Sequence, residues 1–353
     1  HVAIIRPIVE MLNSRFLRYF LISPEMQNHM LAWAGSGGTR NALTKGMIEE
    51  FDVPVPSLLE QKAIADVLGS LDDKIELNRQ MNATLEAMAQ TLFKSWFVDF
   101  DPVIDNALIA GNPLPEALQQ KGELRREQLV EKYGSLENAS HSSDVTIHHS
   151  LFPNAFIHTK ELGWIPDGWK VGPLSRVAKL STESVSPLKY PDKTWTHFSI
   201  PAFDEGIQPS RDLGATIKSG KYKVHENSLL ASKLNPQYPR VWLVDVGEED
   251  SAVCSTEFMP FQPKRAADRF YIYLFMRSDF AQQSIVGRVT GSTGSRQRVK
   301  PKEISHLEIV LPSESIRDHF TNLVSGHMNR VLLNRRTIAD LAKARDTLLP
   351  KLL

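Results

Sequence analysis

A basic, glycine-rich stretch between Arg288 and Lys302 offers the clearest chemistry in the sequence. It holds five basic residues and no acidic residue, and small or hydroxyl side chains separate them. Glycines let backbone N–H groups approach a phosphate closely, and guanidinium groups bind phosphates or base edges through paired hydrogen bonds. We therefore predict a nucleic-acid contact made by Gly291, Ser292, Thr293, Gly294, Ser295, Arg296, Gln297, Arg298 and Lys300. The alternative from these residues alone is an ordinary solvated surface loop.

Further basic and hydrogen-bonding side chains lie in the loops of residues 161–312. Their types suit contacts with phosphates and base edges. The residues that we add to the candidate contact set are Lys218, Lys221, Lys223, Lys233, Asn235, Gln237 and Arg240. Exposed loops of any protein contain such residues, so this second set is less specific than the first.

The sequence signatures of common catalytic sites are missing. We find no G-x-S-x-G, GxxxxGK[ST], H-E-x-x-H or GxGxxG pattern, and no Asn-Pro-Pro-aromatic tetrapeptide. The single cysteine, Cys254, can form neither an internal disulfide nor a cysteine metal cluster. Asp99 and Asp101 lack a third ligand, which favours solvated or capping roles over metal binding. We therefore expect a chain that is not an enzyme and holds no cofactor of its own.

Length and composition indicate a globular protein with more than one domain. The chain has 353 residues, and 41 Lys and Arg balance 41 Asp and Glu. It contains no run of eighteen apolar residues, so no spanning helix is expected, and the start lacks the pattern of a signal peptide. We expect a cytoplasmic protein without membrane contact.

An internal repeat is the strongest feature of the organisation. Four residues of an earlier loop match four residues of the basic loop without a gap: Gly35, Ser36, Gly38 and Arg40 align with Gly291, Ser292, Gly294 and Arg296. The same alignment carries Pro56 and Ser57 onto Pro312 and Ser313, and Asn78 onto Asn334. Each copy has a short helical stretch, the loop, an alternating strand that ends at proline, and a long helix.

The two long helices show apolar residues at alternating spacings of four and three. This spacing is typical of a coiled-coil seam, and an asparagine within a seam fixes its register. The predicted seam residues are Ile64, Leu68, Leu71, Ile75, Asn78, Leu85 and Leu92 in the first helix, and Val324, Val331, Asn334, Ile338, Leu341 and Leu348 in the second. Apolar residues beyond this seam are candidates either for partner docking or for a broader seam: Met81, Met88, Phe93 and Phe97.

We expect an α+β fold with globular domains and two long helices that form an antiparallel coiled coil. Residues 161–312 read as short strands closed by a helix over 268–288. The expected ranges are 58–100 for the first long helix, 101–160 for a connector that is loosely structured from residue 122, and 313–353 for the second long helix.

Together these features resemble the specificity subunits of type I restriction-modification enzymes. The most specific pieces are "VPVPSLLEQKAIADVLGSLDDKIELNRQMNATLEAMAQTLFKSWFVDFDPV", "ELGWIPDGWK" and "IVLPSESIRDHFTNLVSGHMNRVLLNRRTIADLAKARDTLLPKLL", and the resemblance covers nearly the whole chain. It implies two target-recognition domains that each read one half of a split DNA target. It also implies a helix pair that sets the gap between the halves and docks methyltransferase (M) subunits.

The resemblance further implies double-stranded DNA, M subunits and restriction (R) subunits as partners. S-adenosylmethionine, ATP and Mg would belong to those subunits. Residues 161–312 correspond to the second recognition domain, and residues 1–57 correspond to the end of the first. We therefore expect a chain that is truncated at its N-terminus. The alternative is a coiled-coil protein-interaction scaffold without DNA specificity.

Overall fold

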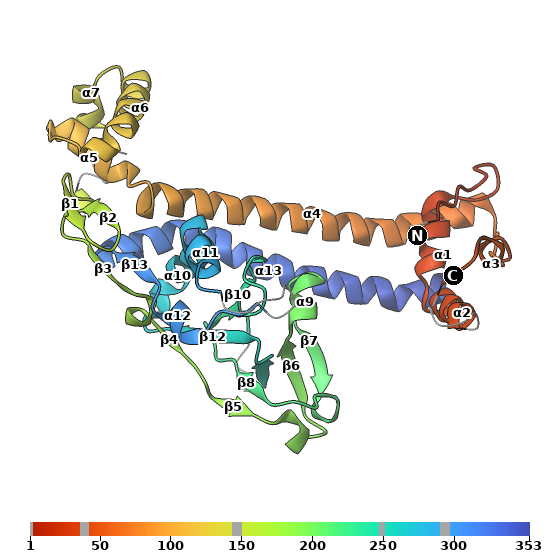
Figure 1. Cartoon of the computed structure of the whole chain (residues 1–353). Coiled ribbons are helices and arrows are strands. Elements are labelled where there is room, and N and C mark those ends of the chain that lie inside the picture. Colours follow the sequence, from red (N-terminus) through yellow and green to blue (C-terminus); the bar gives the residue numbers. More distant parts are fainter. Residues whose placement is uncertain (1–2, 36–41, 143–149, 247–250, 290–296) are drawn as a thin grey trace. The chain divides into compact units, whose positions relative to one another are not determined.

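The computed structural model describes residues 3–35, 42–142, 150–246, 251–289 and 297–353. The chain divides into two compact units, which are residues 1–83 with 331–353 (unit 1) and residues 84–330 (unit 2). Two long helices, α4 (Leu58–Phe97) and α13 (Glu314–Leu352), contribute to both units. The mixture of helices and sheets confirms the expected α+β class (Figure 1).

Unit 1 is helical. Its short helices are α1 (Ser14–Ile22), α2 (Pro24–Gly35) and α3 (Lys45–Glu49). Residues 51–57 then lead into α4, where Ser57 and Glu60 cap each other: Ser57 N donates to Glu60 Oε2 at 2.9 Å, and Glu60 N donates to Ser57 Oγ at 3.3 Å. This reciprocal pair satisfies two backbone donors that a helix start leaves open.

The parts of α4 and α13 in unit 1 run antiparallel, as expected. Asn334 Nδ2 donates to Asn82 Oδ1 at 2.9 Å, and Arg345 Nη1 donates to Asp72 Oδ1 at 2.8 Å, so the later residue of α4 meets the earlier residue of α13. Tyr19 and Leu68 form an apolar cluster with Leu349, which packs α1 against both helices. Polar and apolar contacts together therefore fix the direction of the pair.

The predicted seam residues are all buried or half-buried. Asn78 and Asn334 are each only 2% exposed. Five apolar members of the seam are buried, namely Leu68, Ile75, Val324, Val331 and Ile338. The remaining apolar members are half-buried: Ile64, Leu71, Leu85, Leu92, Leu341 and Leu348. Each helix thus presents one covered stripe, which is what a heptad spacing produces.

The helices also pack antiparallel in unit 2, through aromatic rings. The Phe93 and Phe320 rings lie 6.0 Å apart, and Trp96 stacks on His319 at 5.7 Å. Phe93 and Phe97 are 1% and 4% exposed and both contact Tyr271. These two side chains are therefore covered within the chain and cannot dock a partner. Of the two alternatives for Phe93 and Phe97, the structure supports the broader seam. Met88 is 51% exposed and remains accessible.

The segment after α4 is helical. Phe100 adopts a left-handed conformation (φ 59°) that ends α4 and starts α5 (Asp101–Ala110), followed by α6 (Glu116–Tyr133) and α7 (Leu136–His141). The expectation of a loosely structured connector from residue 122 is wrong for residues 122–133 and 136–141, which are helical. Ile104, Leu108, Leu129 and Ala139 form a small core of their own. The sequence did not predict it because the few apolar residues of this segment are surrounded by charged ones.

The described residues of unit 2 form four small sheets. Strands β1 (Phe156–Thr159) and β2 (Gly163–Pro166) form a hairpin, and β3 (Lys170–Pro173) pairs antiparallel with β13 (Glu308–Leu311). A four-stranded sheet has the order β10–β9–β12–β4, and a five-stranded sheet has the order β5–β8–β11–β6–β7, in which only β11 and β6 are parallel. Their bounds are β4 Ala178–Leu180, β5 Ser184–Val185, β6 Thr194–Phe198, β7 Ser210–Leu213, β8 Lys221–Lys223, β9 Leu229–Ser232, β10 Val241–Leu243, β11 Ala252–Cys254 and β12 Phe258–Pro263.

The core of residues 161–312 lies between these sheets and short helices. Trp242, Phe198 and Phe258 pack edge to face within it. The helices are α9 (Ile200–Asp204), α10 (Arg269–Arg277), α11 (Asp279–Val286) and α12 (Pro301–Ser305). The single helix expected over 268–288 is two helices, because Ser278 leaves the helical conformation and its Oγ accepts from Ala281 N at 3.3 Å.

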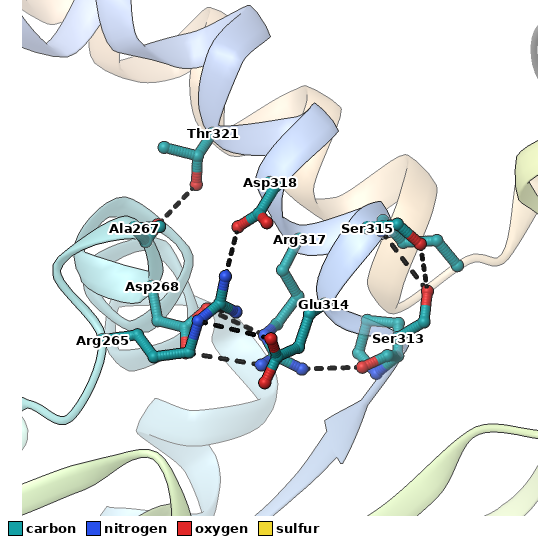
Figure 2. Close-up of polar contacts among 11 residues, drawn as sticks. Arg265, Ala267, Asp268, Ser313, Glu314, Ser315, Arg317, Asp318 and Thr321 are labelled. Atoms are coloured by element: carbon teal, nitrogen blue, oxygen red, sulfur yellow. Dashed lines mark hydrogen bonds and ion pairs between the residues drawn. The ribbon is translucent and has the colours of Figure 1, made fainter.

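A buried ion pair joins the start of α10 to the start of α13 (Figure 2). Arg317 Nε donates to Asp268 Oδ1 at 2.8 Å, and the two side chains are 8% and 2% exposed. Arg265 adds contacts to Asp268 at 3.3 Å and Asp318 at 2.7 Å, and Thr321 Oγ1 donates to the Ala267 carbonyl at 2.7 Å. The sheets of unit 2 are thereby held on the first turns of α13.

Candidate nucleic-acid interface

Two loops that are distant in sequence meet beside the four-stranded sheet. The loop of residues 233–240 follows β9, and residues 297–300 precede α12. Asn235 N donates to the Gln297 carbonyl at 2.9 Å, and Val299 N donates to the Lys233 carbonyl at 3.0 Å. The structure thus brings residues of both sequence-predicted contact sets onto one surface, which we call the loop junction (residues 233–240 and 297–300).

A turn shapes the backbone of residues 233–240. Asn235 is left-handed (φ 47°), a conformation that asparagine tolerates better than most side chains, and Tyr238 N donates to its carbonyl at 2.9 Å. Gln237 and Tyr238 are exposed at the tip, Tyr238 by 61%. An exposed aromatic ring can stack on a base, and an amide can read a base edge.

Two arginines of the loop junction are held by carboxylates. Arg298 contacts Glu257 through Nε at 3.2 Å and Nη2 at 3.1 Å, and these hydrogen bonds raise the pKa of its guanidinium. Arg240 contacts Asp204 through Nε at 2.7 Å and Nη2 at 2.9 Å. Such forked pairs fix the orientation of the guanidinium plane. Both arginines are therefore positioned before any ligand arrives.

Two lysines of the loop junction carry charge that no described carboxylate neutralises. Within the described part of the chain, neither Lys233 nor Lys300 forms an ion pair, and Lys300 is exposed. Unpaired ammonium groups beside oriented arginines give the surface a local excess of positive charge. That is the electrostatic condition for holding a phosphate backbone.

The three other predicted lysines lie away from the loop junction, on or before β8. Lys218 is exposed, whereas Lys221 is 8% exposed and its Nζ donates to Ser219 Oγ at 2.6 Å. Burial lowers the pKa of the Lys221 ammonium. Lys223 pairs with Glu183 at 2.6 Å. Gly291, Ser292, Thr293, Gly294, Ser295 and Arg296 lie outside the described residues.

Sequence reasoning missed three residues of this surface. Tyr238 lies between two prolines in "NPQYPR". Prolines restrict the backbone of a loop, so an aromatic residue between them could have been recognised in the sequence as a candidate contact residue. Asp204 and Glu257 hold Arg240 and Arg298, but no spacing in the sequence links them to those arginines. Ion pairs between residues this far apart in the sequence can be identified only from the folded chain.

Asp99 and Asp101, for which the sequence favours solvated or capping roles, form ion pairs with lysines. Lys121 Nζ lies 3.1 Å from a carboxylate oxygen of each, and Lys94 also binds Asp99. Burial opposes ionisation of Asp99, but the two lysines outweigh it and lower its pKa. No group of three or more His, Cys, Asp or Glu side chains suited to a metal occurs among the residues with a described position. In that same part of the chain, no helix is both long and apolar enough to cross a membrane.

Comparison with known proteins gives consistent matches. A family model described as the type I restriction modification DNA specificity domain matches residues 1–87. The HindI specificity subunit of Haemophilus influenzae is 27% identical over 99% of this chain and 79% of its own length. The MjaIX specificity subunit of Methanocaldococcus jannaschii is 24% identical over 95% of this chain and 67% of its own length.

Solved structures of the same kind also match. The S subunit of a type I restriction-modification system from M. genitalium aligns with 97% of this chain and 73% of its own, at 13% identity and a TM-score of 0.48. The HsdS subunit of Thermoanaerobacter tengcongensis aligns with 99% and 72%, at 15% identity and a TM-score of 0.31.

The sequence matches are all to one class of protein, the type I restriction-modification specificity proteins. The chain is similar to two specificity subunits of this class along nearly its entire length.

Proposed function

We propose that this chain is the DNA-recognition subunit of a type I restriction-modification complex, and that residues 161–312 read one half of a bipartite DNA target. Its homology to specificity subunits over 99% and 95% of its length supports this role. The scaffold alternative, a coiled-coil protein without DNA specificity, is not favoured, because these relatives are specificity subunits over the same residues.

The meeting of Asn235 with Gln297 is the observation that carries the proposal. It unites a loop that offers an asparagine, a glutamine and an exposed tyrosine with the end of the basic stretch. Hydrogen-bonding side chains suit base edges, and the ammonium groups of Lys233 and Lys300, which pair with no described carboxylate, suit phosphates. The clamped Arg240 and Arg298 would then present fixed donors to the DNA.

We assign the other tasks of the complex to partner subunits. In this division of labour the chain is not an enzyme, and S-adenosylmethionine, ATP and Mg are held by M and R subunits. The α4 and α13 pair would serve as the spacer between half-sites and as the docking site for M subunits, with Met88 accessible for it. Residues 1–57 would be the end of the first recognition domain.

A duplex-DNA titration of the chain with its M partner, at two salt concentrations, tests the proposal. Binding should weaken steeply as salt rises, because cations on the protein displace counterions from the phosphates. The matched variants are Lys300→Ala in the loop junction and Lys343→Ala on the exposed side of α13. A stable complex with M that binds no duplex even at low salt would instead favour the scaffold.

A further inference from the structure

A pocket beside the start of α13 has a strongly cationic wall. It has a volume of about 470 Å³, and five basic and two acidic side chains line it. We call it the α13 pocket (walls from Lys170, Arg176, Lys264, Ser313 and Arg317). None of its basic residues belongs to the contact sets that the sequence predicted, so its charge needs an explanation of its own.

The two acidic side chains of the α13 pocket are already bound by arginines (Figure 2). Asp268 binds Arg317 at 2.8 Å, and Glu314 lies 3.7 Å from Arg265. Arg265 also binds Asp318 at 2.7 Å. These carboxylates are therefore matched by Arg265 and Arg317, and the other cations of the wall keep their charge.

Three exposed cations of the wall carry that excess charge, namely Lys170, Arg176 and Lys264. Among the residues that the structure describes, none of the three forms an ion pair. Lys264 N donates to the Val177 carbonyl at 2.8 Å, which holds Lys264 next to the 3-10 turn η1 (Leu174–Arg176). The backbone therefore keeps Lys264 beside Arg176.

Arg176 crosses β3 at a glycine. A β-carbon added to Gly172 would lie 3.3 Å from Arg176 Cδ and 3.6 Å from its Nη1, so the arginine covers the strand at this point. Alternate residues of a strand point to the same face, and Lys170 is two residues before Gly172. Lys170 and Arg176 are thus brought together on one face of β3.

Further cations lead from the α13 pocket to the loop junction. Helix α12 begins directly after Lys300 and packs against η1 and β4 (Figure 1). Just after α12, the Leu307 carbonyl accepts from Leu174 N at 2.8 Å, so this helix runs from the loop junction to η1. Lys302 of α12 and Lys179 of β4 are exposed, and neither pairs with a described carboxylate. Together they continue the positive surface between Lys300 and Arg176.

A surface with several unpaired cations suits a polyanion whose charges recur at short intervals. The phosphates of duplex DNA meet this condition. Guanidinium and ammonium groups, with the hydroxyl of Ser313 in the same wall, are donors of the kind that phosphates accept. Continuity with the loop junction favours DNA over an acidic protein segment, because Asn235 and Gln237 there suit base edges.

We propose that the α13 pocket binds the phosphate backbone of duplex DNA beside the half-site that residues 161–312 read. This inference rests on the proposed function and adds to it a second contact, one that holds the duplex whatever its base sequence. Lys170, Arg176 and Lys264 bind the phosphates, and the carboxylate-bound Arg265 and Arg317 form the fixed wall behind them.

Salt-dependent titrations of the full chain with its M partner test the site. Two duplexes are compared, one selected for tight binding and one of random sequence. Arg176→Ala should weaken binding to both by the same factor, about tenfold, because a phosphate contact carries no base information. The slope of log affinity against log salt should become shallower by about one unit, and by about two units when Lys170→Ala and Lys264→Ala are combined.

The matched control is Arg126→Ala, at an exposed position of α6 in the same unit, which should change neither affinity nor slope. Thermal melts show whether each variant is folded. An unchanged slope in the folded pocket variants would overturn the proposal. A loss confined to the selected duplex would also overturn it, because Arg176 would then read bases.

A photo-reactive residue in place of Lys264 identifies the occupant in the assembled complex. Cross-links to the duplex support the proposal, whereas cross-links to the M subunit would show that the pocket holds a protein segment and would overturn it. Failure of the proposed function itself gives a different result, because the wild-type complex would then bind no duplex. If the wild-type complex selects DNA and the pocket variants keep its salt slope, only the present inference fails.

Discussion

Gln61 and Arg317 perform the same structural task in the two repeats. Gln61 Nε2 donates to the Pro56 carbonyl at 2.8 Å, and Arg317 Nη1 donates to the Pro312 carbonyl at 2.7 Å. Each also binds the residue that caps the neighbouring short helix: Gln61 Oε1 accepts from Asn13 N at 2.8 Å, and Arg317 contacts Asp268. The first turn of each long helix is therefore tied to the segment before it and to a second helix.

Replacement of Gln61 by alanine should destabilise unit 1. Gln61 is fully buried, and its loss leaves the Asn13 N–H and the carbonyls of Met11 and Pro56 without their partner. We expect the free energy of unfolding to fall by about 2–4 kcal/mol, the cost of buried polar groups left unpaired. Urea denaturation followed by circular dichroism measures this change.

The matched control is Gln80→Ala, on an exposed face of the same helix, where the side chain bonds Glu76 at 3.0 Å. Its effect should stay near about 0.5 kcal/mol. Similar losses for Gln61→Ala and Gln80→Ala would contradict a special role for Gln61.

Asp268→Asn should destabilise unit 2 more strongly. It leaves the Arg317 guanidinium, 8% exposed, without its counter-charge in a buried setting. Removal of one member of a buried ion pair costs about 3–5 kcal/mol. The double variant Asp268→Asn with Arg317→Met removes both charges and should recover part of that loss in the same urea measurement. A double variant no more stable than Asp268→Asn alone would argue against an uncompensated charge as the cause.

Unit 1 should lose stability at alkaline pH through Tyr19. Burial, with the hydrogen bond that Tyr19 Oη donates to Asp72 Oδ2 at 2.9 Å, raises the pKa of this phenol from 10.0 to about 12. Because the folded pKa lies above the unfolded one, the stabilisation is complete below pH 10 and is lost as pH rises towards 12. Tyr19→Phe removes that contribution.

Unfolding free energies between pH 9 and pH 12 therefore should converge for wild type and Tyr19→Phe as the pH rises. Other tyrosines titrate equally in both proteins, so the difference between the two curves isolates Tyr19. A constant difference across this range would show that the Tyr19 phenol does not titrate differently in the folded chain.

Substitutions in the basic stretch should separate base reading from phosphate binding. If Arg296 hydrogen-bonds to a base edge, Arg296→Ala should weaken DNA binding by about 1–3 kcal/mol and reduce the preference for one base at that position. If Lys300 contacts a phosphate, Lys300→Ala should weaken all sequences alike and reduce the salt slope by about one unit. Titrations with matched and single-substituted duplexes at several salt concentrations distinguish the two patterns, and Lys343→Ala is the control. No change in either quantity would remove that residue from the interface.

The two long helices and the internal repeat could be predicted from the sequence because each depends on a pattern that recurs along the chain. Heptad spacing around Asn78 and Asn334 predicted two long helices, and the structure places both asparagines in covered positions. The matching proline-terminated segments before them predicted two equivalent halves. Such patterns can be recognised because the apolar spacing repeats in every turn of a long helix.

The features that sequence reasoning missed depend on contacts between distant residues. The described residues after Phe100 include helices α5, α6 and α7, which pack together because Ile104 and Leu108 contact the cluster of Leu129 and Ala139. No single helical period in the sequence reveals that contact. From the sequence alone, Arg240 and Lys223 were equal members of one candidate contact set. The structure orients Arg240 beside Asp204 at the candidate surface and pairs Lys223 with Glu183 elsewhere.

Selection of a DNA sequence is the activity that we propose for this chain. The most direct test is to incubate the chain and its M partner with randomised duplex DNA, recover the bound pool at two salt concentrations, and sequence it. We predict enrichment of a short half-site, with total binding that falls steeply as salt rises. A bound pool that stays random while the complex with M is intact would contradict DNA recognition by this chain.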